Sequence, residues 1–487
     1  MTTFDRSLPS DLPSQLFIGG SWVDADGGRT FDVIDPATED VLTSIADAGP
    51  DQGVEALDAA VAAQDSWAAT APRERAEILR RGFEIITRRA DDFARLMTLE
   101  MGKPLTTSYG EVTYGAEFLR WFSEQAVRIR GDYGVLPEGS LRQLVLKRPV
   151  GPCLLITPWN FPLAMATRKA GPALAAGCTV VIRPASNTPL TTLLFAKAMQ
   201  EAGVPDGVLN VITGRDHGVT DKVLADPRLR KVSFTGSTPV GRGLLKQASE
   251  HVLRTSMELG GNAPFIVFDD ADVDAAVSGA LAAKIRNNGE VCVAANRFIV
   301  HESVAAEFTE KLTDGMSKVG YGDPMDKATE VGPLITGKDR DNVHSLVESA
   351  RAAGATVLLG GEIGSGKGYY YPPTVISGVA PDADVMMNEI FGPVAPITTF
   401  GTEEQALEIA NSVPVGLAAY VYTRDINRIQ RMGDELEVGM IGANGGVFSN
   451  PAAPCGGVKE SGLGREGSYQ GIEEYLETIY MALPNPF

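Results

Sequence analysis

KVSFTGSTPVGR, at residues 231–242, predicts an apolar strand that passes through a Gly-Ser-Thr turn into a helix. Three apolar runs of similar length precede it: CLLIT at 153–157, CTVVI at 178–182 and VLNVIT at 208–213. A stretch of helical spacing at 190–202 lies between two of these runs. Because strands that alternate with helices form parallel sheets, the sequence predicts an α/β domain here.

The turn within this stretch is a candidate phosphate site. Gly236 and Ser237 stand where the helix begins, and backbone N–H groups at a helix N-terminus attract anions. The G-x-G-x-x-G pattern of many dinucleotide-binding folds is missing, since Ser237 and Thr238 follow Gly236. The turn alone therefore does not identify a nucleotide site.

A second series of strands and helices follows Leu259. Its apolar runs are FIVF at 265–268, RFIV at 297–300, AYVYT at 419–423 and GMIGA at 439–443. Helices are expected at 272–287 and 304–318, and at least two more between 51 and 101, where Pro72 interrupts the pattern. Because 487 residues exceed what one hydrophobic core supports, we expect a second α/β domain.

Two strand-like segments, 132–148 and the tail 473–487, have no neighbour in either series. An unpaired strand edge readily pairs with another chain. We therefore expect this protein to form a homo-oligomer.

Charge and cysteine content exclude several classes of protein. The 43 Lys and Arg residues against 62 Asp and Glu give a net charge of −19, which repels nucleic acid and anionic membranes. The longest apolar stretch, 170–182, is too short to span a bilayer, and the first 20 residues contain no signal-peptide run. Four cysteines and four histidines lack the spacing of a metal site or a disulfide framework. We expect a cytoplasmic protein with reduced thiols and no metal.

Cys292 lies in RNNGEVCVAANR (286–297) and is a candidate nucleophile. Gly289 can free the backbone just before the thiol, and Arg286 and Arg297 place positive charge on either side, which favours a thiolate. Taken alone, this cysteine fits a half-buried residue at a helix end better than a nucleophile.

Glu258 and Asn160 are further candidates. Glu258 precedes a Gly-Gly pair in MELGGNAP (257–264), and glycines allow backbone conformations that other residues avoid, so its carboxylate can point into a cleft. Asn160 stands in ITPWNFP (156–162), where prolines on both sides hold an amide donor rigidly, as an oxyanion requires. Taken alone, each also fits an ordinary role, as a capping carboxylate and a turn asparagine.

Six segments together resemble the aldehyde dehydrogenase superfamily. They are TPWNFP (157–162), FTGSTPVG (234–241), MELGGNAP (257–264), NNGEVC (287–292), EIFGP (389–393) and GGVKESGLGREG (456–467). The resemblance runs nearly the whole chain and implies an α/β protein with a Rossmann-like cofactor domain at 1–131 and 149–258 and an α/β catalytic domain at 259–454. It also implies a small β oligomerisation arm from 132–148 and 455–487, in a homodimer or homotetramer.

The resemblance assigns roles to the three candidates. Cys292 would attack an aldehyde to form a thiohemiacetal, whose oxyanion is held by the Asn160 side chain and the Cys292 backbone N–H. Hydride would then pass to a nicotinamide and leave a thioester. Water activated by Glu258 would hydrolyse that thioester to the carboxylic acid.

The same resemblance implies a dinucleotide site. Its residues are Thr157, Pro158, Trp159, Arg183, Ala185, Ser186, Gly236, Ser237, Gly260, Glu389 and Phe391. Many NAD-preferring relatives carry an acidic residue where this chain has Ser186, and a serine beside the Arg183 guanidinium can accept the 2′-phosphate that a carboxylate repels. We expect NADP to be preferred over NAD. The alternative is that Arg183 merely replaces a lysine on the ribose.

Within the superfamily the chain is most similar to bacterial succinate-semialdehyde dehydrogenases, through TRKAGPALAAGC (167–178), the ANR after the cysteine and SGLGREGSYQGIEEYLE (461–477). In those enzymes two arginines and a serine bind the distal carboxylate of the substrate, and the matching residues are Arg168, Arg286 and Ser449. Structural ion pairs are the alternative for the arginines. Glutarate semialdehyde, 2-oxoglutarate semialdehyde and an aromatic aldehyde are alternative substrates.

Three residues depart from the family pattern. Glu290 replaces the usual glutamine two residues before the nucleophile, where a negative charge could raise the pKa of the thiol or shift the loop. Ala294 replaces a second cysteine of some relatives, so a disulfide from that position to Cys292 is not expected. Cys455 replaces an aromatic residue near the substrate.

Two other functions fit the sequence less well. The CoA-acylating aldehyde dehydrogenases lack a base where this chain has Glu258. A non-enzymatic binding protein would not need Cys292, Glu258 and Asn160 together.

Overall fold

The four apolar runs between 153 and 235 are the central strands of an eight-stranded sheet in the computed structural model, which describes residues 5–486. Across the sheet the order is β2-β1-β9-β8-β7-β10-β11-β21. The strands are β1 (Leu16–Ile18), β2 (Ser21–Val23), β7 (Cys153–Ile156), β8 (Val180–Arg183), β9 (Leu209–Val211), β10 (Lys231–Thr235), β11 (Arg254–Glu258) and β21 (Gly462–Leu463). The strands from β9 to β11 are parallel, as predicted, and β1 and β21 join them antiparallel at the edges.

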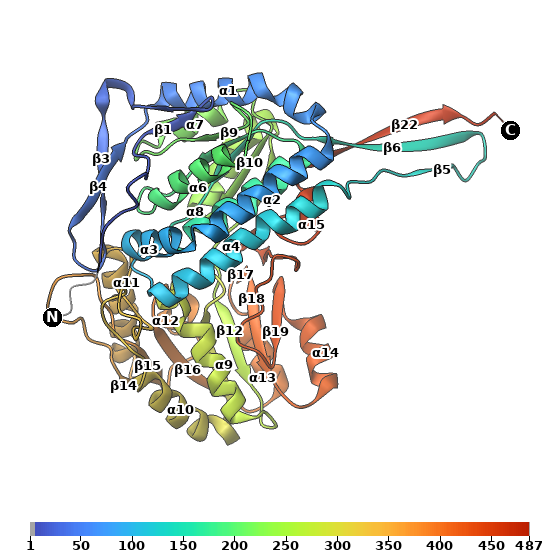
Figure 1. The fold of residues 1–487 in the computed structure, drawn as a ribbon. Coiled ribbons are helices and arrows are strands. Elements are labelled where there is room, and N and C mark those ends of the chain that lie inside the picture. Colours follow the sequence, from blue (N-terminus) through green and yellow to red (C-terminus); the bar gives the residue numbers. More distant parts are fainter. Residues whose placement is uncertain (1–4, 487) are drawn as a thin grey trace.

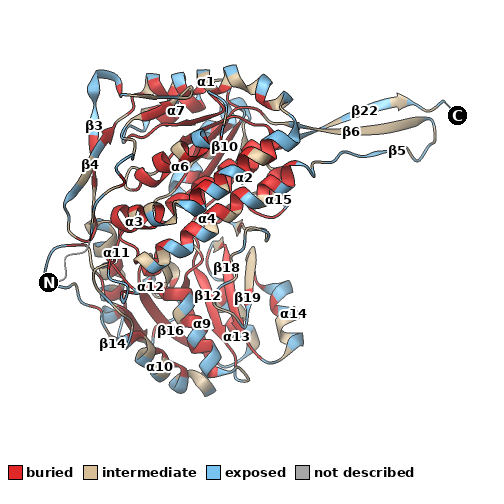
Figure 2. Cartoon of the chain, in the orientation of Figure 1, coloured by how far each residue is buried: buried red, intermediate tan, exposed pale blue. Residues whose placement is uncertain are grey.

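Helices cover both faces of this sheet (Figure 1). One face carries α1 (Pro50–Ala69), α7 (Gly218–Leu224) and α8 (Thr238–Ala248), and the other carries α2 (Pro72–Arg88), α3 (Ala90–Met101), α4 (Leu105–Ala126), α5 (Pro162–Ala176) and α6 (Leu190–Glu201). Successive side chains of a strand point to opposite faces, so Leu154 packs toward α1 whereas Cys153 and Leu155 pack toward α5. Because both faces are buried (Figure 2), these strands are apolar at nearly every position.

Pro72 does not simply interrupt a helical pattern. It is the first residue of α2, where its missing N–H loses no helical hydrogen bond. The segment between 50 and 101 therefore forms three separate helices, α1, α2 and α3.

The second sheet has seven strands in the order β14-β15-β16-β13-β12-β18-β19. Its strands are β12 (Ala263–Val267), β13 (Ala295–His301), β14 (Thr356–Leu359), β15 (Thr374–Ser377), β16 (Val394–Phe400), β18 (Ala418–Tyr422) and β19 (Met440–Ala443). Every neighbouring pair except β14–β15 is parallel. Helices α9 (Val273–Ile285) and α10 (Glu302–Ser317) pack on one face, and α13 (Glu403–Asn411) and α14 (Ile426–Glu435) on the other. The expected second α/β unit is confirmed.

The remaining elements are short or lie at the margins of the two sheets. They are β3 (Thr30–Ile34), β4 (Val41–Ala46), α11 (Gly337–Ala352), α12 (Asp384–Met387), β17 (Val415–Gly416), β20 (Val458–Lys459), α15 (Gln470–Glu473) and the 3₁₀ helices η1 (Asp26–Gly28), η2 (Ser249–His251) and η3 (Arg286–Gly289). Between residues 5 and 486, no helix is both long enough and apolar enough to cross a membrane.

The two segments expected to lack a neighbour pair with each other. β22 (Leu476–Pro484) runs antiparallel to β6 (Leu141–Pro149), and β5 (Tyr133–Val135) adds a third strand. These strands form an arm that extends away from both sheets, with the C-terminus at its tip (Figure 1). Tyr133 and Tyr480 on the arm are 60% and 54% exposed. The outer strands β5 and β22 are the open edges of the arm.

The end of the chain contributes to more than the arm. β21 lies within the expected oligomerisation segment 455–487, yet it pairs with β11 in the first sheet. α15 lies against α5 on one face of that sheet. Only β22, at the end of this segment, belongs to the arm.

Candidate active site

The carboxyl ends of parallel strands bring most of the predicted site residues to one edge of the first sheet. β7 leads into Thr157, β8 ends at Arg183, β10 leads into Gly236 and β11 ends at Glu258. Loops at this edge of a parallel sheet commonly form ligand sites. The Gly236 N–H donates to the Glu258 carbonyl over 3.0 Å, so the phosphate turn and the carboxylate loop are joined.

Cys292 lies half-buried in the loop between η3 and β13. Three residues with left-handed backbone precede it: Asn287, Asn288 and Gly289 have φ of 55°, 60° and 77°. A Cβ at Gly289 would also lie 2.3 Å from the Gly392 carbonyl oxygen. This position in front of the thiol therefore requires glycine.

The surroundings of Cys292 keep its thiol protonated. Burial raises the pKa of Cys292 to about 12, the neighbouring Cys455 adds to the rise, and Arg168 opposes it. Since a thiol is a poor nucleophile compared with its thiolate, Cys292 needs a base for activation.

Arg297 does not supply the positive charge that the sequence suggested. Its guanidinium donates to the backbone carbonyls of Asn262, Ile409 and Ala410 over 2.9, 2.8 and 2.7 Å. The expectation of a cation on this side of Cys292 was therefore wrong. Arg297 instead joins β13 to the loop before β12 and to the last turn of α13.

Asn160 lies just before α5 and is buried, with its amide beside the nucleophile loop. Nδ2 donates one hydrogen to the Glu290 carbonyl over 3.1 Å, and the Asn287 Nδ2 donates to both the Asn160 and the Glu290 carbonyl over 3.1 Å. Because an amide nitrogen carries two hydrogens, one N–H of Asn160 remains for an oxyanion.

Glu258 is buried beside a second carboxyl, Glu466. Its Oε1 has no hydrogen-bond partner among the described residues, and burial followed by the charge of Glu466 raises the pKa of Glu258 well above its usual range. Lys169 donates to Glu466 over 2.6 Å and to Ser233 over 3.0 Å. Burial raises the pKa of Glu466, but Lys169 and Arg168 outweigh it and lower the pKa overall. Surroundings that raise the pKa of one carboxyl and lower that of its neighbour favour one ionised group and one group that exchanges a proton.

The glycines after Glu258 serve close approach rather than unusual conformation. Neither Gly260 nor Gly261 has a positive φ, so the conformational expectation was wrong. A Cβ at Gly260 would lie 3.0 Å from Glu389 Oε2, and one at Gly261 would lie 2.4 Å from the Cys292 carbonyl oxygen. Because Gly260 and Gly261 have no side chain, the loop after Glu258 can lie close to both Glu389 and Cys292.

Glu290 anchors the loop that carries the thiol. The Ile335 N–H donates to Glu290 Oε1 over 3.0 Å, and the side chain is fully buried. Burial raises the pKa of Glu290 well above its usual range. Of the two effects considered for this departure, the position of the loop is the one the contacts favour.

A cavity of about 280 Å³ contains one predicted substrate residue and one departure from the family pattern. Its lining residues are Tyr114, Gly439, Met440, Ile441, Phe448, Ser449, Asn450, Ala453, Pro454 and Cys455. Arg168 donates to the Tyr114 hydroxyl over 2.5 Å and lies 3.5 Å from Glu466 Oε2.

Arg286 is half-buried and differs from Arg168 in its contacts. Its guanidinium carbon lies 5.7 Å from the centre of the Phe161 ring, and no carboxylate between residues 5 and 486 forms an ion pair with it. An arginine without an anion partner is available to a ligand carboxylate.

The residues expected around the nicotinamide lie together. The rings of Trp159 and Phe391 meet edge to face, with centroids 5.5 Å apart, and the Gly261 N–H donates to Glu389 Oε1 over 3.0 Å. Burial raises the pKa of Glu389 to about 7. Buried Thr157 Oγ1 has no hydrogen-bond partner among the described residues. Exposed Ser237 leaves the first turn of α8 open, so these residues fit a dinucleotide.

Arg183 and Ser186 are arranged differently from the expected pair. The Arg183 guanidinium donates to the Thr220 hydroxyl and, over 2.8 Å, to the Asp216 carbonyl. Ser186 is half-buried in the loop after β8. In this conformation the arginine is engaged by the protein, and Ser186 is the less constrained of the two residues.

The sequence profile of the Aldehyde dehydrogenase family matches residues 22–480. The chain belongs to this family. It is 59% identical over 448 residues to a succinate-semialdehyde dehydrogenase of Paenarthrobacter nicotinovorans, a match that covers 92% of this chain and all of that one. It is 46% identical over 469 residues to a glutarate-semialdehyde dehydrogenase of Pseudomonas aeruginosa, covering 96% of this chain and 97% of that one. The crystal structure of an NADP-dependent enzyme of Escherichia coli superposes with a TM-score of 0.97 at 47% identity, covering 99% of this chain and all of that one.

Several side chains around this aldehyde dehydrogenase site were not singled out in the sequence. Lys169 and Glu466 lie beside Glu258, Tyr114 binds Arg168, and Lys103 donates to the Asn160 carbonyl over 2.6 Å. Lys169 and Glu466 lie within the motifs at 167–178 and 456–467, and this position was the only signal that the sequence offered for them. Their burial, which gives them their effect, has no signature in the sequence.

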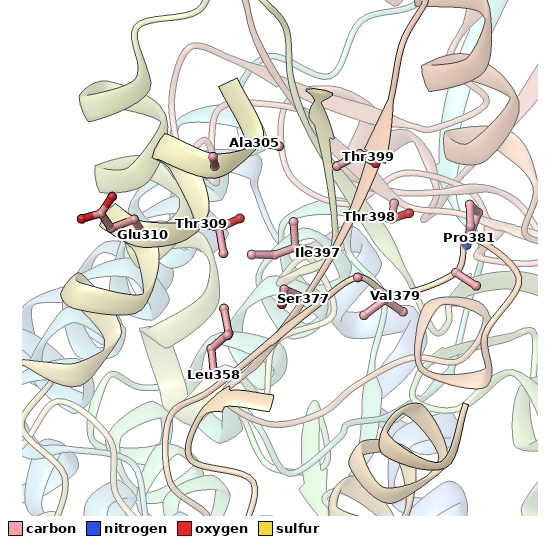
Figure 3. Close-up of a pocket in the computed structure, with 13 residues that line it drawn as sticks. Ala305, Thr309, Glu310, Leu358, Ser377, Val379, Pro381, Ile397, Thr398 and Thr399 are labelled. Atoms are coloured by element: carbon pink, nitrogen blue, oxygen red, sulfur yellow. The ribbon is translucent and has the colours of Figure 1, made fainter. Parts of the chain in front are cut away.

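A separate cavity of about 680 Å³ lies away from these residues, between α10 and the strands β15 and β16 (Figure 3). Ala305 and Thr309 line it from the helix, and Ser377 and Ile397 from the strands. None of the predicted site residues is among its lining. This cavity therefore lies apart from the residues assigned to aldehyde oxidation.

Proposed function

We propose that this chain oxidises succinate semialdehyde to succinate with NADP. The observation that carries the proposal is the meeting of a half-buried thiol, an amide with one remaining N–H and a carboxyl oxygen without a described partner, beside an arginine that pairs with no carboxylate among residues 5–486. The similarity to succinate-semialdehyde dehydrogenases supports the substrate. Glutarate semialdehyde is the second candidate, because a glutarate-semialdehyde dehydrogenase is also similar over nearly the full chain.

Steady-state kinetics test the proposal directly. Succinate semialdehyde, glutarate semialdehyde and benzaldehyde are each assayed with NADP and with NAD. We expect the highest kcat/KM for succinate semialdehyde with NADP. A higher value for glutarate semialdehyde would transfer the assignment to the second candidate, and no turnover of any aldehyde would contradict enzymatic function.

In the proposed mechanism the Cys292 thiol loses its proton to Glu258 and attacks the aldehyde carbon. The free N–H of Asn160 and the Cys292 backbone N–H stabilise the oxyanion of the thiohemiacetal. A bound nicotinamide dinucleotide supplies the hydride acceptor. After Glu258 has released this first proton to solvent, it takes a proton from the water that hydrolyses the thioester, and the Cys292 sulfur leaves as a thiolate.

For the substrate, Arg286 binds the distal carboxylate, with Arg168 and Ser449 completing the site. Arg286 is the stronger candidate because Arg168 already contacts Tyr114 and Glu466. Cys455 leaves more room in the 280 Å³ cavity than an aromatic residue would.

Replacement of Arg286 by Leu is expected to raise KM for succinate semialdehyde by about 10- to 100-fold, because a charge-assisted pair contributes about 1.5–3 kcal/mol. Butanal has the same carbon chain without the carboxylate, so its KM should change little. Arg286→Lys is the matched control and should show an intermediate KM, since it keeps the charge but loses the planar fork. Equal effects on both substrates would refute the assignment.

For the cofactor, Trp159, Glu389 and Phe391 flank the nicotinamide, Gly236 and Ser237 bind the pyrophosphate, and Ser186 accepts the 2′-phosphate. Thr157, Pro158, Arg183, Ala185 and Gly260 complete the site. The preference for NADP is supported by the absence of an acidic residue at 186 and by the similarity to an NADP-dependent enzyme.

Replacement of Ser186 by Asp is expected to lower kcat/KM for NADP by about 5-fold or more, because like charges at close range cost at least about 1 kcal/mol. The value for NAD should stay the same or rise, since a carboxylate can accept from the 2′-hydroxyl. Ser186→Asn, similar in size and neutral, is the control. A parallel loss with both cofactors would show that the residue does not discriminate between them.

The arm supports a proposal about assembly. Its open edges β5 and β22 and its exposed tyrosines suit pairing with a second copy, in a homodimer or homotetramer. The division into a cofactor domain at 1–131 and 149–258 and a catalytic domain at 259–454 is supported by the two separate sheets. The assignment of β21 to the first sheet narrows the arm from 455–487 to β22.

A further inference from the structure

Lys103 is a fully buried ammonium in the short connection between α3 and α4. Its Nζ donates to the backbone carbonyl of Asn160 over 2.6 Å and forms an ion pair with Glu111 of α4. It also lies 4.3 Å from the centre of the Phe161 ring. The hydrogen bond, the ion pair and the ring contact of this ammonium thus involve Asn160, Glu111 and Phe161.

Glu111 holds the same segment from its other side. One carboxylate oxygen binds Lys103, and the other accepts the backbone N–H groups of Leu163 and Ala164 over 2.9 and 3.1 Å. These N–H groups belong to the first turn of α5, where a carboxylate is favourable. The ion pair therefore fixes the chain from 160 to 164 at both ends.

The Asn160 carbonyl is also linked to the nucleophile loop. Asn287 donates to it and to the Glu290 carbonyl, while the Asn160 side chain donates to the same Glu290 carbonyl. Displacement of the Asn160 backbone would therefore change where its remaining N–H points.

The stability of the fold does not by itself explain why the charged side chain of Lys103 is buried. Burial lowers the pKa of Lys103, and the charge of Glu111 opposes that effect. Buried ion pairs are often no more stabilising than apolar residues of the same size. The ion pair of Lys103 and Glu111 contacts the backbone of Asn160, the proposed oxyanion donor, and can therefore serve to position that residue.

We propose that Lys103, supported by Glu111, is a positioning residue that acts through Asn160. It holds the Asn160 backbone so that the free amide N–H meets the oxygen of the aldehyde as Cys292 adds to it. The inference rests on the proposed oxyanion role of Asn160.

A double-mutant cycle between Lys103→Met and Asn160→Ala tests this coupling. We expect Asn160→Ala to lower kcat by about 100- to 1000-fold, as loss of one oxyanion donor does elsewhere. Lys103→Met should lower kcat by up to about 100-fold, since misplacement of a reacting group by about 1 Å costs that much. In the Asn160→Ala background, Lys103→Met should lower kcat less than about 3-fold, because a residue that acts through Asn160 has nothing left to position.

Two controls separate positioning from folding. KM for NADP and the cooperativity of thermal unfolding should be unchanged by Lys103→Met, and Lys103→Arg, which keeps the charge, should restore part of kcat. If Lys103→Met does not fold, Glu111→Gln enters the same cycle, since its amide oxygen still accepts from Leu163 and Ala164 while the charge beside Lys103 is lost.

The outcomes distinguish the inference from the proposed function. An Asn160→Ala variant with unchanged kcat would overturn the oxyanion role itself. A normal loss on Asn160→Ala, combined with a Lys103→Met or Glu111→Gln effect of the same size in both backgrounds, would overturn only the positioning role.

Discussion

Replacement of Cys292 by Ala is expected to abolish aldehyde oxidation, with kcat reduced by at least about 10⁴-fold, because loss of a covalent nucleophile costs other enzymes that much or more. The variant should fold normally, since the side chain is half-buried and loses only one sulfur atom. NADPH formation with succinate semialdehyde measures the loss, and a shift of the melting temperature by NADP shows that the dinucleotide site is intact.

Cys455→Ser is the matched control for this prediction. Cys455 is also half-buried, and it lines the cavity next to the proposed substrate site. Its replacement should change KM while retaining turnover. Equal loss of kcat in the two variants would contradict the assignment of Cys292 as the sole nucleophile.

The strands and the central motifs were predictable from the sequence because both depend on local patterns. Parallel strands buried on both faces are apolar throughout, so the runs at 153–157 and 231–235 identified β7 and β10 directly. The role of Gly289 was also predictable locally, since the expected freedom of the backbone before the thiol is found as a φ of 77°.

Interactions between distant segments could not be predicted in this way. Lys169 and Glu466 are 297 residues apart, and Lys103 meets Asn160 across 57 residues. In the sequence, Lys103, Lys169 and Glu466 resemble solvated surface charges, whereas the fold buries all three. The expectation for Arg297 was wrong for the same reason. Its place in the sequence suggested a role beside Cys292, but in the fold it contacts backbone carbonyls of distant segments.

In the arm, the strands were predicted correctly from the local sequence pattern, but the pairing between them was not. The alternation in 132–148 and 473–487 predicted strands, but strand pairing depends on segments more than 300 residues apart. The sequence alone could not distinguish pairing within the chain from pairing between copies. In the proposed oligomer both kinds of pairing occur. Strand β6 pairs with β5 and β22 within the chain, and the outer edges of β5 and β22 remain open for a second copy.

In the pH profile of kcat we expect an acid limb, the range in which kcat falls as Glu258 becomes protonated. Glu466→Gln is expected to move this limb to lower pH. The negative charge of Glu466 helps to raise the pKa of Glu258, and Arg168 and Lys169 act in the opposite direction. Removal of that charge leaves both cations beside Glu258 and stabilises its ionised form. A limb that moves to higher pH would show that Glu466 does not act on Glu258 through its charge.

Replacement of Glu258 by Gln is expected to lower kcat by about 10²- to 10⁴-fold, the usual contribution of a general base. Only the ionised carboxylate can accept a proton, and burial raises the pKa of Glu258 above its ordinary value. In the unmodified enzyme kcat should therefore fall as the pH drops through this raised pKa, and the Gln variant, which cannot ionise, should lack that limb.

A rapid-mixing experiment then separates the two proton transfers assigned to Glu258. If its main task is hydrolysis of the thioester, the variant still forms a first burst of NADPH and slows only in the steady state. The thiol of Cys292, with its pKa raised to about 12 by burial, also needs a base, so the burst should slow as well, though less than the steady state. Equal slowing of both phases would mean that Glu258 acts before the thioester forms and that another group activates the water.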